Sequence, residues 1–222
     1  MFRASVENPF SGPHQIEKTL YSGEDHAKAT AAIILIHGRG ATAESILMLA
    51  DEFNGENILY AAPQAAGFQW YPYSFLAPTD RNEPGLSSGL QVIFDTIANL
   101  ESNGIPKKRV IIAGFSQGAC LASEFVARHP ARYGGLIAFS GGLIGDEVSA
   151  ASYQGSLSGT PCFLGCSNID PHIPMERVRE SENILSAMGG DVMAKIYKGL
   201  GHTVNHDEID KAQKVINSAI SD

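Results

Sequence analysis

Short apolar runs alternate with amphipathic segments from about residue 30 to the end of the chain. Six of these runs have the length of buried strands and are bounded by glycine, proline or polar residues. They cover residues 31–36, 57–63, 109–115, 134–140, 161–166 and 193–199. Apolar positions recur at helical spacing over 90–100 and 209–219. Strands that alternate with helices in this way predict an α/β fold, with a mostly parallel central sheet and helices on both faces.

The first part of the chain has a weaker pattern. Residues 14–21, followed by a turn at Ser22-Gly23, predict an early edge strand, so we interpret 1–25 as an N-terminal extension that includes this strand. The whole chain has 222 residues, and no linker or repeat divides it. We therefore expect one domain over 1–222.

Charge and cysteine content narrow the class of protein. The net charge of −8 disfavours nucleic acid as a partner. No apolar run approaches the roughly 20 residues of a membrane span, and the N-terminus has no signal-peptide core, so we expect a cytoplasmic protein. Cys162 and Cys166 would lie ~13 Å apart on one strand, too far for a disulfide. With Cys120 they make three thiols, which fits a reducing compartment.

The strongest chemical signal is the segment Gly114-Phe115-Ser116-Gln117-Gly118. It follows one predicted strand and precedes a helical pattern, the context of a strand-turn-helix elbow that exposes a serine hydroxyl. We predict Ser116 as a nucleophile. The helix that starts here would also point the Gln117 amide at a negative charge beside the serine, as half of an oxyanion hole.

The segment His37-Gly38-Arg39-Gly40 follows the first long strand. We expect the Arg39 amide to supply the other half of the oxyanion hole, and His37 to hold the loop by hydrogen bonds. The same stretch also matches G-x-G-x-x-A, a dinucleotide-binding pattern. That pattern needs an acidic residue at the end of the next strand, where this chain has only Pro63-Gln64, so a nucleotide-dependent oxidoreductase is the weaker alternative.

A serine nucleophile needs an orienting acid after it in the chain. Asp170 follows the strand 161–166 through a short loop, and we predict it as that acid. Asp146 lies one strand too early, and Asp191 lies before the last strand, at the wrong edge of the sheet.

The base should follow the last strand. His202 does so through Leu200-Gly201, on the same edge of the sheet as the other two residues. His206 is its rival, and the two histidines at i, i+4 could also form a metal pair. Asp207 and Glu208 instead place His206 at the start of the C-terminal helix, so we predict His202 as base and no metal site.

Four motifs, HGRG, GFSQG, SNIDPHIP and GLGHTV, together resemble the phospholipase/carboxylesterase family, whose members have the α/β-hydrolase fold. The resemblance covers residues from about 30 to the C-terminus. It implies a Ser116–Asp170–His202 triad, oxyanion donors at Arg39 and Gln117, and no cofactor. It also implies small-molecule esters as substrates, with thioesters or lysophospholipids as alternatives. Two positions depart from the family pattern, since members often carry leucine at Arg39 and an aliphatic residue at His172.

The segment between Ser140 and Pro161 is too short for a large cap, so side chains already in place must bind the acyl group. The candidate substrate-binding residues are Trp70, Phe75, His172, Ile173 and Met175. They favour short to medium acyl chains. A catalytically silent binding protein on the same fold is the main alternative, and a homodimer is left open as an assembly.

Overall fold

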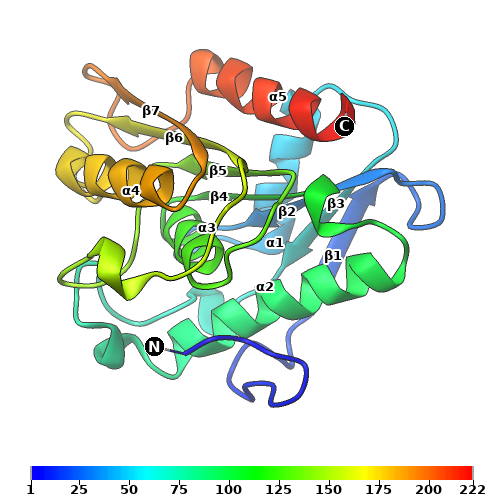
Figure 1. Cartoon of the computed structure of the whole chain (residues 1–222), viewed down its shortest axis with the longest axis horizontal. Helices are drawn as coiled ribbons and strands as arrows, with labels where there is room; N and C mark the ends of the chain where they lie inside the picture. The colour runs from blue at the N-terminus through cyan, green and yellow to red at the C-terminus, as the bar shows by residue number, and fades with distance from the viewer. Residues whose placement is uncertain (1, 222) are drawn as a thin grey trace.

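The computed structural model describes residues 2–221 and is built on a seven-stranded sheet in the order β1-β3-β2-β4-β5-β6-β7 (Figure 1). β1 pairs antiparallel with β3, and every other neighbouring pair is parallel. The strands are β1 Thr19–Gly23, β2 Ala31–Ile36, β3 Ile58–Pro63, β4 Val110–Phe115, β5 Gly135–Phe139, β6 Pro161–Ser167 and β7 Asp191–Tyr197.

Helices cover both faces of the sheet (Figure 1). The α-helices are α1 Ala43–Leu47, α2 Gly85–Ser102, α3 Gln117–Arg128, α4 Met175–Ala187 and α5 His206–Ser221. Short 3-10 helices are η1 Met48–Glu52, η2 Ala66–Phe68, η3 Thr79–Asn82, η4 Lys107–Arg109 and η5 Ala150–Ser152. Residues of α2, α3 and α4 pack in one core on one face, and residues of α1 and α5 pack in a second core on the other.

The inner strand β2 is apolar at every position because it is covered on both faces. Ala32, Ile34 and Ile36 belong to the core under α2, α3 and α4, whereas Ile33 and Leu35 belong to the core under α1 and α5. All of these side chains are inaccessible to solvent. Each buried isoleucine contributes about 1.5–3 kcal/mol through the hydrophobic effect, so this strand anchors both layers.

The predicted α/β-hydrolase architecture is confirmed, with the six apolar runs forming β2 to β7. The bounds of the early edge strand were wrong: it begins at Thr19 rather than at residue 14. Residues 13–17 form turns instead. His14 is buried in these turns, where its ring accepts the Ala66 amide and donates to the Trp70 carbonyl. Gly23 closes the strand with a φ of 82°.

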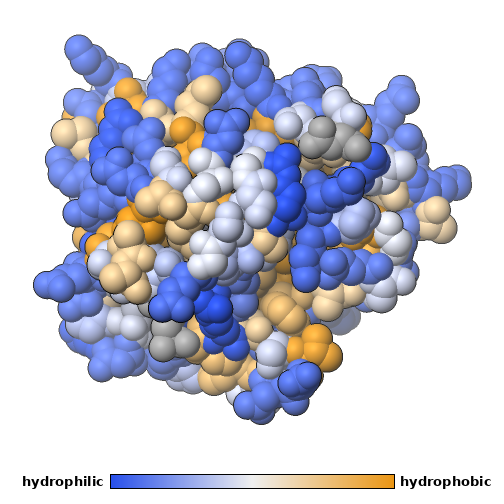
Figure 2. All heavy atoms as spheres, viewed as in Figure 1, coloured by the Kyte–Doolittle hydropathy of each residue, from blue (hydrophilic) through white to orange (hydrophobic). Residues whose placement is uncertain are grey.

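The surface and the connections fit an uncapped fold. Residues 140–160, between β5 and β6, contain only the three-residue helix η5, so no large cap is present there. On the face shown in Figure 2, hydrophilic side chains predominate and apolar ones form separate patches. Within residues 2–221, no helix combines the length and apolar character that a membrane crossing requires.

Candidate active site

Three polar side chains from distant parts of the chain meet at one edge of the sheet. Ser116 follows β4, Asp170 follows β6, and His202 follows β7. Because β4, β6 and β7 run parallel, their carboxyl ends lie at the same edge and their loops converge. The strand order therefore brings together residues that are up to 86 positions apart.

The serine lies in a strained elbow. Ser116 has φ 55° and ψ −119°, between the end of β4 and the start of α3. The turn needs small neighbours: a Cβ on Gly114 would lie 2.5 Å from the Gly118 carbonyl carbon, and one on Gly118 would lie 2.1 Å from the Ile36 oxygen. The two glycines thus let α3 start directly against β2 and β4, with the serine hydroxyl exposed to the cavity.

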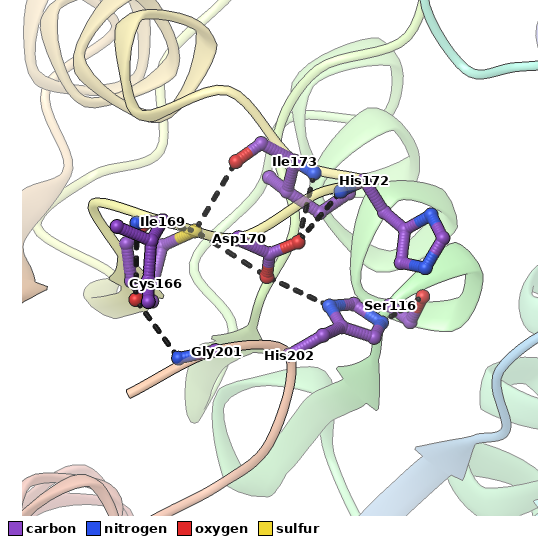
Figure 3. A network of polar contacts seen from close by, with 9 residues as sticks. Ser116, Cys166, Ile169, Asp170, His172, Ile173, Gly201 and His202 are labelled. Carbon is purple, nitrogen blue, oxygen red and sulfur yellow. Dashed lines mark hydrogen bonds and ion pairs between the residues drawn. The ribbon is translucent and has the colours of Figure 1, made fainter. Parts of the chain in front are cut away.

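The three side chains form a continuous hydrogen-bonded chain (Figure 3). His202 Nε2 lies 2.9 Å from Ser116 Oγ, and His202 Nδ1 lies 2.7 Å from Asp170 Oδ2. A carboxylate only accepts hydrogen bonds, so Nδ1 carries the proton and Nε2 accepts from the hydroxyl. The imidazole is therefore in the tautomer that can remove a proton from Ser116.

Local backbone geometry holds the carboxylate of Asp170. Its Oδ1 accepts the amides of His172 at 2.9 Å and Ile173 at 3.0 Å, and the side chain is fully buried. Burial works to raise the pKa of Asp170, but the hydrogen bonds from His202 and the two amides outweigh it and hold the pKa below its ordinary value. The group is a carboxylate at neutral pH.

The two predicted oxyanion donors belong to two segments that meet beside the serine. Gln117 is the first residue of α3, and Arg39 lies in the loop after β2. A Cβ on Gly38 would lie 3.4 Å from the Ser116 Cβ, so this loop passes directly beside the serine. Arg39, Ser116 and Gln117 all line one cavity.

That cavity has a volume of about 530 Å³. Of the candidate substrate-binding residues, Phe75, His172 and Ile173 line it, whereas Trp70 and Met175 do not. Trp70 is completely buried, and its indole N–H donates to the His37 carbonyl at 2.9 Å. Met175 is the first residue of α4, is 40% exposed and does not line the cavity. The placement of these two residues in the pocket was wrong.

Sequence reasoning missed Phe115 and Cys120 as cavity residues. Phe115 lines the cavity, and its ring packs against His202 with centroids 4.8 Å apart. Because Phe115 directly precedes Ser116 in the sequence, its position could have indicated that it lies at the cavity. Cys120 also lines the cavity, but burial raises the pKa of its thiol to about 12, so it stays a neutral apolar wall. Tyr71 and Tyr73, which lie between the candidates Trp70 and Phe75 in the sequence, line the cavity as well.

The competing residues lie elsewhere. Asp146 is exposed in the loop between β5 and β6, and Asp191 begins β7, at the end of that strand opposite to the site. His206 is the first residue of α5. Both ring nitrogens of His202 are engaged by Ser116 and Asp170, which leaves none for a metal shared with His206.

His37 holds its loop rather than facing the serine. It is buried, its Nδ1 donates to Gly38 O at 2.8 Å, and its Nε2 accepts the Ala65 amide at 3.1 Å. Gln64 contacts the same ring and accepts the Ala43 amide at 2.9 Å. The Gln64 side chain thus binds the amide of Ala43, the last residue of the G-x-G-x-x-A stretch, which does not favour the nucleotide-site alternative.

Comparisons with known proteins show the family to which the chain belongs. A crystal structure of a phospholipase/carboxylesterase from Dyadobacter fermentans is 40% identical, with a TM-score of 0.89 over 93% of this chain and 99% of that one. An acyl-protein thioesterase 1 homologue of Dictyostelium discoideum is 27% identical over 92% of this chain and 97% of its own length. Acyl-protein thioesterase 1 of Gibberella zeae is 24% identical over 86% of this chain and 91% of its own. The model of the phospholipase/carboxylesterase family matches residues 21–220, and the chain belongs to that family.

Proposed function

We propose that the protein is a serine carboxylesterase in which Ser116, His202 and Asp170 act as nucleophile, base and orienting acid. The observation that carries the proposal is the hydrogen-bonded chain of these three side chains beside the cavity, with distances of 2.9 and 2.7 Å. A buried carboxylate, an oriented imidazole and a strained serine have the arrangement that acyl transfer requires.

In the proposed reaction, His202 Nε2 takes the proton of Ser116 as Oγ forms a bond to the ester carbonyl carbon. The amides of Arg39 and Gln117 donate to the oxyanion that develops. Collapse of this intermediate breaks the bond to the alcohol oxygen, which leaves with the proton from Nε2. Water then loses a proton to His202 Nε2 as its oxygen forms a bond to the acyl carbon. The bond from this carbon to Ser116 Oγ breaks, Oγ regains the proton from Nε2, and the carboxylic acid is released.

The lining of the cavity is the basis for the proposed size of the substrate. Tyr71, Phe75 and Ile173 offer apolar surface beside Ser116, and no cap covers them. We propose esters with short to medium acyl chains as substrates. Thioesters would use the same residues, and relatives named acyl-protein thioesterases make them the first alternative to test.

The decisive experiment uses Ser116→Ala. The variant should keep the fold and lose at least about 10³-fold in kcat on p-nitrophenyl acetate, because the nucleophile is gone. A fluorophosphonate probe should label wild type at Ser116 and leave the variant unlabelled. Ester turnover above a few per cent of wild type in the variant would contradict the assignment, and a folded, unlabelled wild type would favour the silent binding protein.

A further inference from the structure

The guanidinium of Arg39 is bound by residues 69–73 at the wall of the cavity. Its Nη1 donates to Gln69 Oε1 at 2.6 Å and to Pro72 O at 2.9 Å. Its Nη2 donates to Tyr71 O at 2.9 Å and to Tyr73 O at 2.7 Å. Three consecutive carbonyls therefore converge on one side chain, and the chain from Phe68 to Tyr73, here named the bridging loop, wraps around it.

The side chain of Gln117 holds the same loop from a second element. Its Oε1 accepts the Trp70 amide at 2.9 Å, and its Nε2 donates to Tyr71 O at 2.8 Å. Gln117 is 6% exposed, so these bonds form away from water and depend little on solvent competition. Tyr71 O thus receives one hydrogen bond from Arg39 and one from Gln117.

Arg39 and Gln117 are also the two residues whose amides are proposed to bind the oxyanion. Their amides belong to separate segments, the loop after β2 and the first turn of α3. Arg39 lies between two glycines, and Gly40 has a φ of 76° with open space at its Cβ position. A peptide flanked in this way has wide conformational freedom unless another contact fixes it.

The bridging loop supplies such contacts and is itself anchored to the rest of the molecule. Gly40 N donates to Phe68 O at 2.7 Å, and the neighbouring residues Arg39 and Gln69 are joined by a side-chain hydrogen bond. The Trp70 indole donates to His37 O, and the Tyr73 amide donates to Asn82 Oδ1 at 2.9 Å. One segment therefore contacts both residues proposed to form the oxyanion hole, and it is also bonded to the rest of the molecule at His37 and Asn82.

We propose that the bridging loop sets the separation of the Arg39 and Gln117 amides, with the side chains of these two residues acting as positioning residues. This inference rests on the proposed esterase function. Oxyanion donors act only when they are held about 2.7–3.1 Å from the developing charge, so a small displacement of either amide lowers the rate. Arg39 thereby has two separate roles, its amide at the reacting oxygen and its guanidinium in the loop.

The test replaces the guanidinium and keeps the amide. Arg39→Met should lower kcat on p-nitrophenyl acetate by about 10- to 100-fold, less than the loss of a whole oxyanion donor, with KM within about twofold. Affinity for a trifluoromethyl ketone, which forms an oxyanion on Ser116, should fall by a similar factor. Arg39→Lys retains the charge and some donors, and should restore part of kcat.

Arg81→Met is the matched control. The Arg81 guanidinium stacks on the Tyr73 ring, 4.6 Å from its centroid, without lining the cavity, so its removal should leave kcat within about twofold. Hydrogen exchange on the intact proteins should show faster exchange at residues 68–73 in Arg39→Met and not in Arg81→Met.

Two results would overturn the inference while wild-type esterase activity stands. One is an Arg39→Met variant with wild-type kcat and ketone affinity. The other is a variant whose only defect is a higher KM for longer acyl chains, which would make the loop a pocket wall alone. A wild-type protein without ester turnover or fluorophosphonate labelling would instead remove the proposed function, and this inference with it.

Discussion

The two sides of the cavity are held by different kinds of contact. On the side of Asp170, the carboxylate is bonded to amides two and three residues further along the chain, in a turn that the local sequence specifies. On the side of the bridging loop, the partners are distant: Gln117 is 47 residues from Trp70, and His14 is 56 residues from it. The reacting groups therefore rest on local turns, and the wall rests on tertiary contacts.

Two histidines extend this contrast. The Ala65 amide donates to His37 and the Ala66 amide donates to His14, and both rings pack against Trp70. Burial lowers the pKa of each histidine, although hydrogen bonds to backbone carbonyls partly oppose it. Both rings therefore stay neutral at neutral pH and keep an acceptor nitrogen for the amides of Ala65 and Ala66, just before the bridging loop. The comparison teaches that substitutions on the first side should act on the proton transfer, and those on the second should act on the positions of the oxyanion amides and on the shape of the cavity.

The largest effect should come from the first side. Asp170→Asn should lower kcat by about 10³–10⁴-fold, because an amide cannot hold the His202 tautomer that accepts the serine proton. Steady-state kinetics on p-nitrophenyl acetate measures it. Asp146→Asn, at an exposed carboxylate, is the control and should stay within about twofold of wild type. Equal losses in the two variants would remove the distinction between the acids.

A smaller effect is expected on the second side. Phe75→Ala removes a buried cavity side chain, and kcat/KM for hexanoate relative to acetate should fall about 3- to 10-fold, since each lost methylene contact is worth about 0.8 kcal/mol or less. Phe75→Leu keeps more of the packing, so its hexanoate-to-acetate ratio of kcat/KM should lie between those of wild type and Phe75→Ala. Phe68→Ala is the control, because Phe68 is 53% exposed and outside the cavity. An unchanged chain-length profile in Phe75→Ala would show that the wall does not select the acyl group.

The last expected effect is on stability and not on the rate, and it concerns the chain that follows His202. Glu208 is buried, its Oε2 accepts the Asn205 amide, and its Oε1 has no partner among the described residues. Burial raises its pKa from 4.5 to about 7. Between these values the unfolded chain has lost the proton and the folded one keeps it, so the group's contribution to stability is complete below pH 4.5 and is lost as pH rises to 7.

Glu208→Gln removes this titration. The variant should gain stability relative to wild type at pH 8, on the order of 2 kcal/mol or several degrees in Tm, and lose that advantage below pH 4.5. Thermal unfolding across pH 4–8 measures the difference, and Glu56→Gln, at an exposed position, should follow wild type throughout. A constant offset at every pH would mean that packing, and not ionisation, sets the effect.

The sequence by itself determined the sheet and the order of the site. The apolar runs that became β2 to β6 are buried on both faces, and a strand in that environment needs apolar residues at every position, whereas the edge strand β7 is only partly buried. Ser116, Asp170 and His202 follow β4, β6 and β7, and parallel strands place their following loops together. These inferences needed only chain order and local turn chemistry, which is why the three side chains are found at hydrogen-bonding distance.

The tertiary structure alone decided what the side chains around them do. Trp70 and Phe75 are aromatic residues of one segment, and nothing in their spacing separates the one that enters the core from the one that lines the cavity. From the sequence, Arg39 is only a polar residue at a position where family members often carry leucine. In the structure its guanidinium binds the carbonyls of residues 71–73. Every residue carries a carbonyl, so such partners leave no mark in a sequence. Only the folded path of the chain determines which carbonyls reach a given side chain.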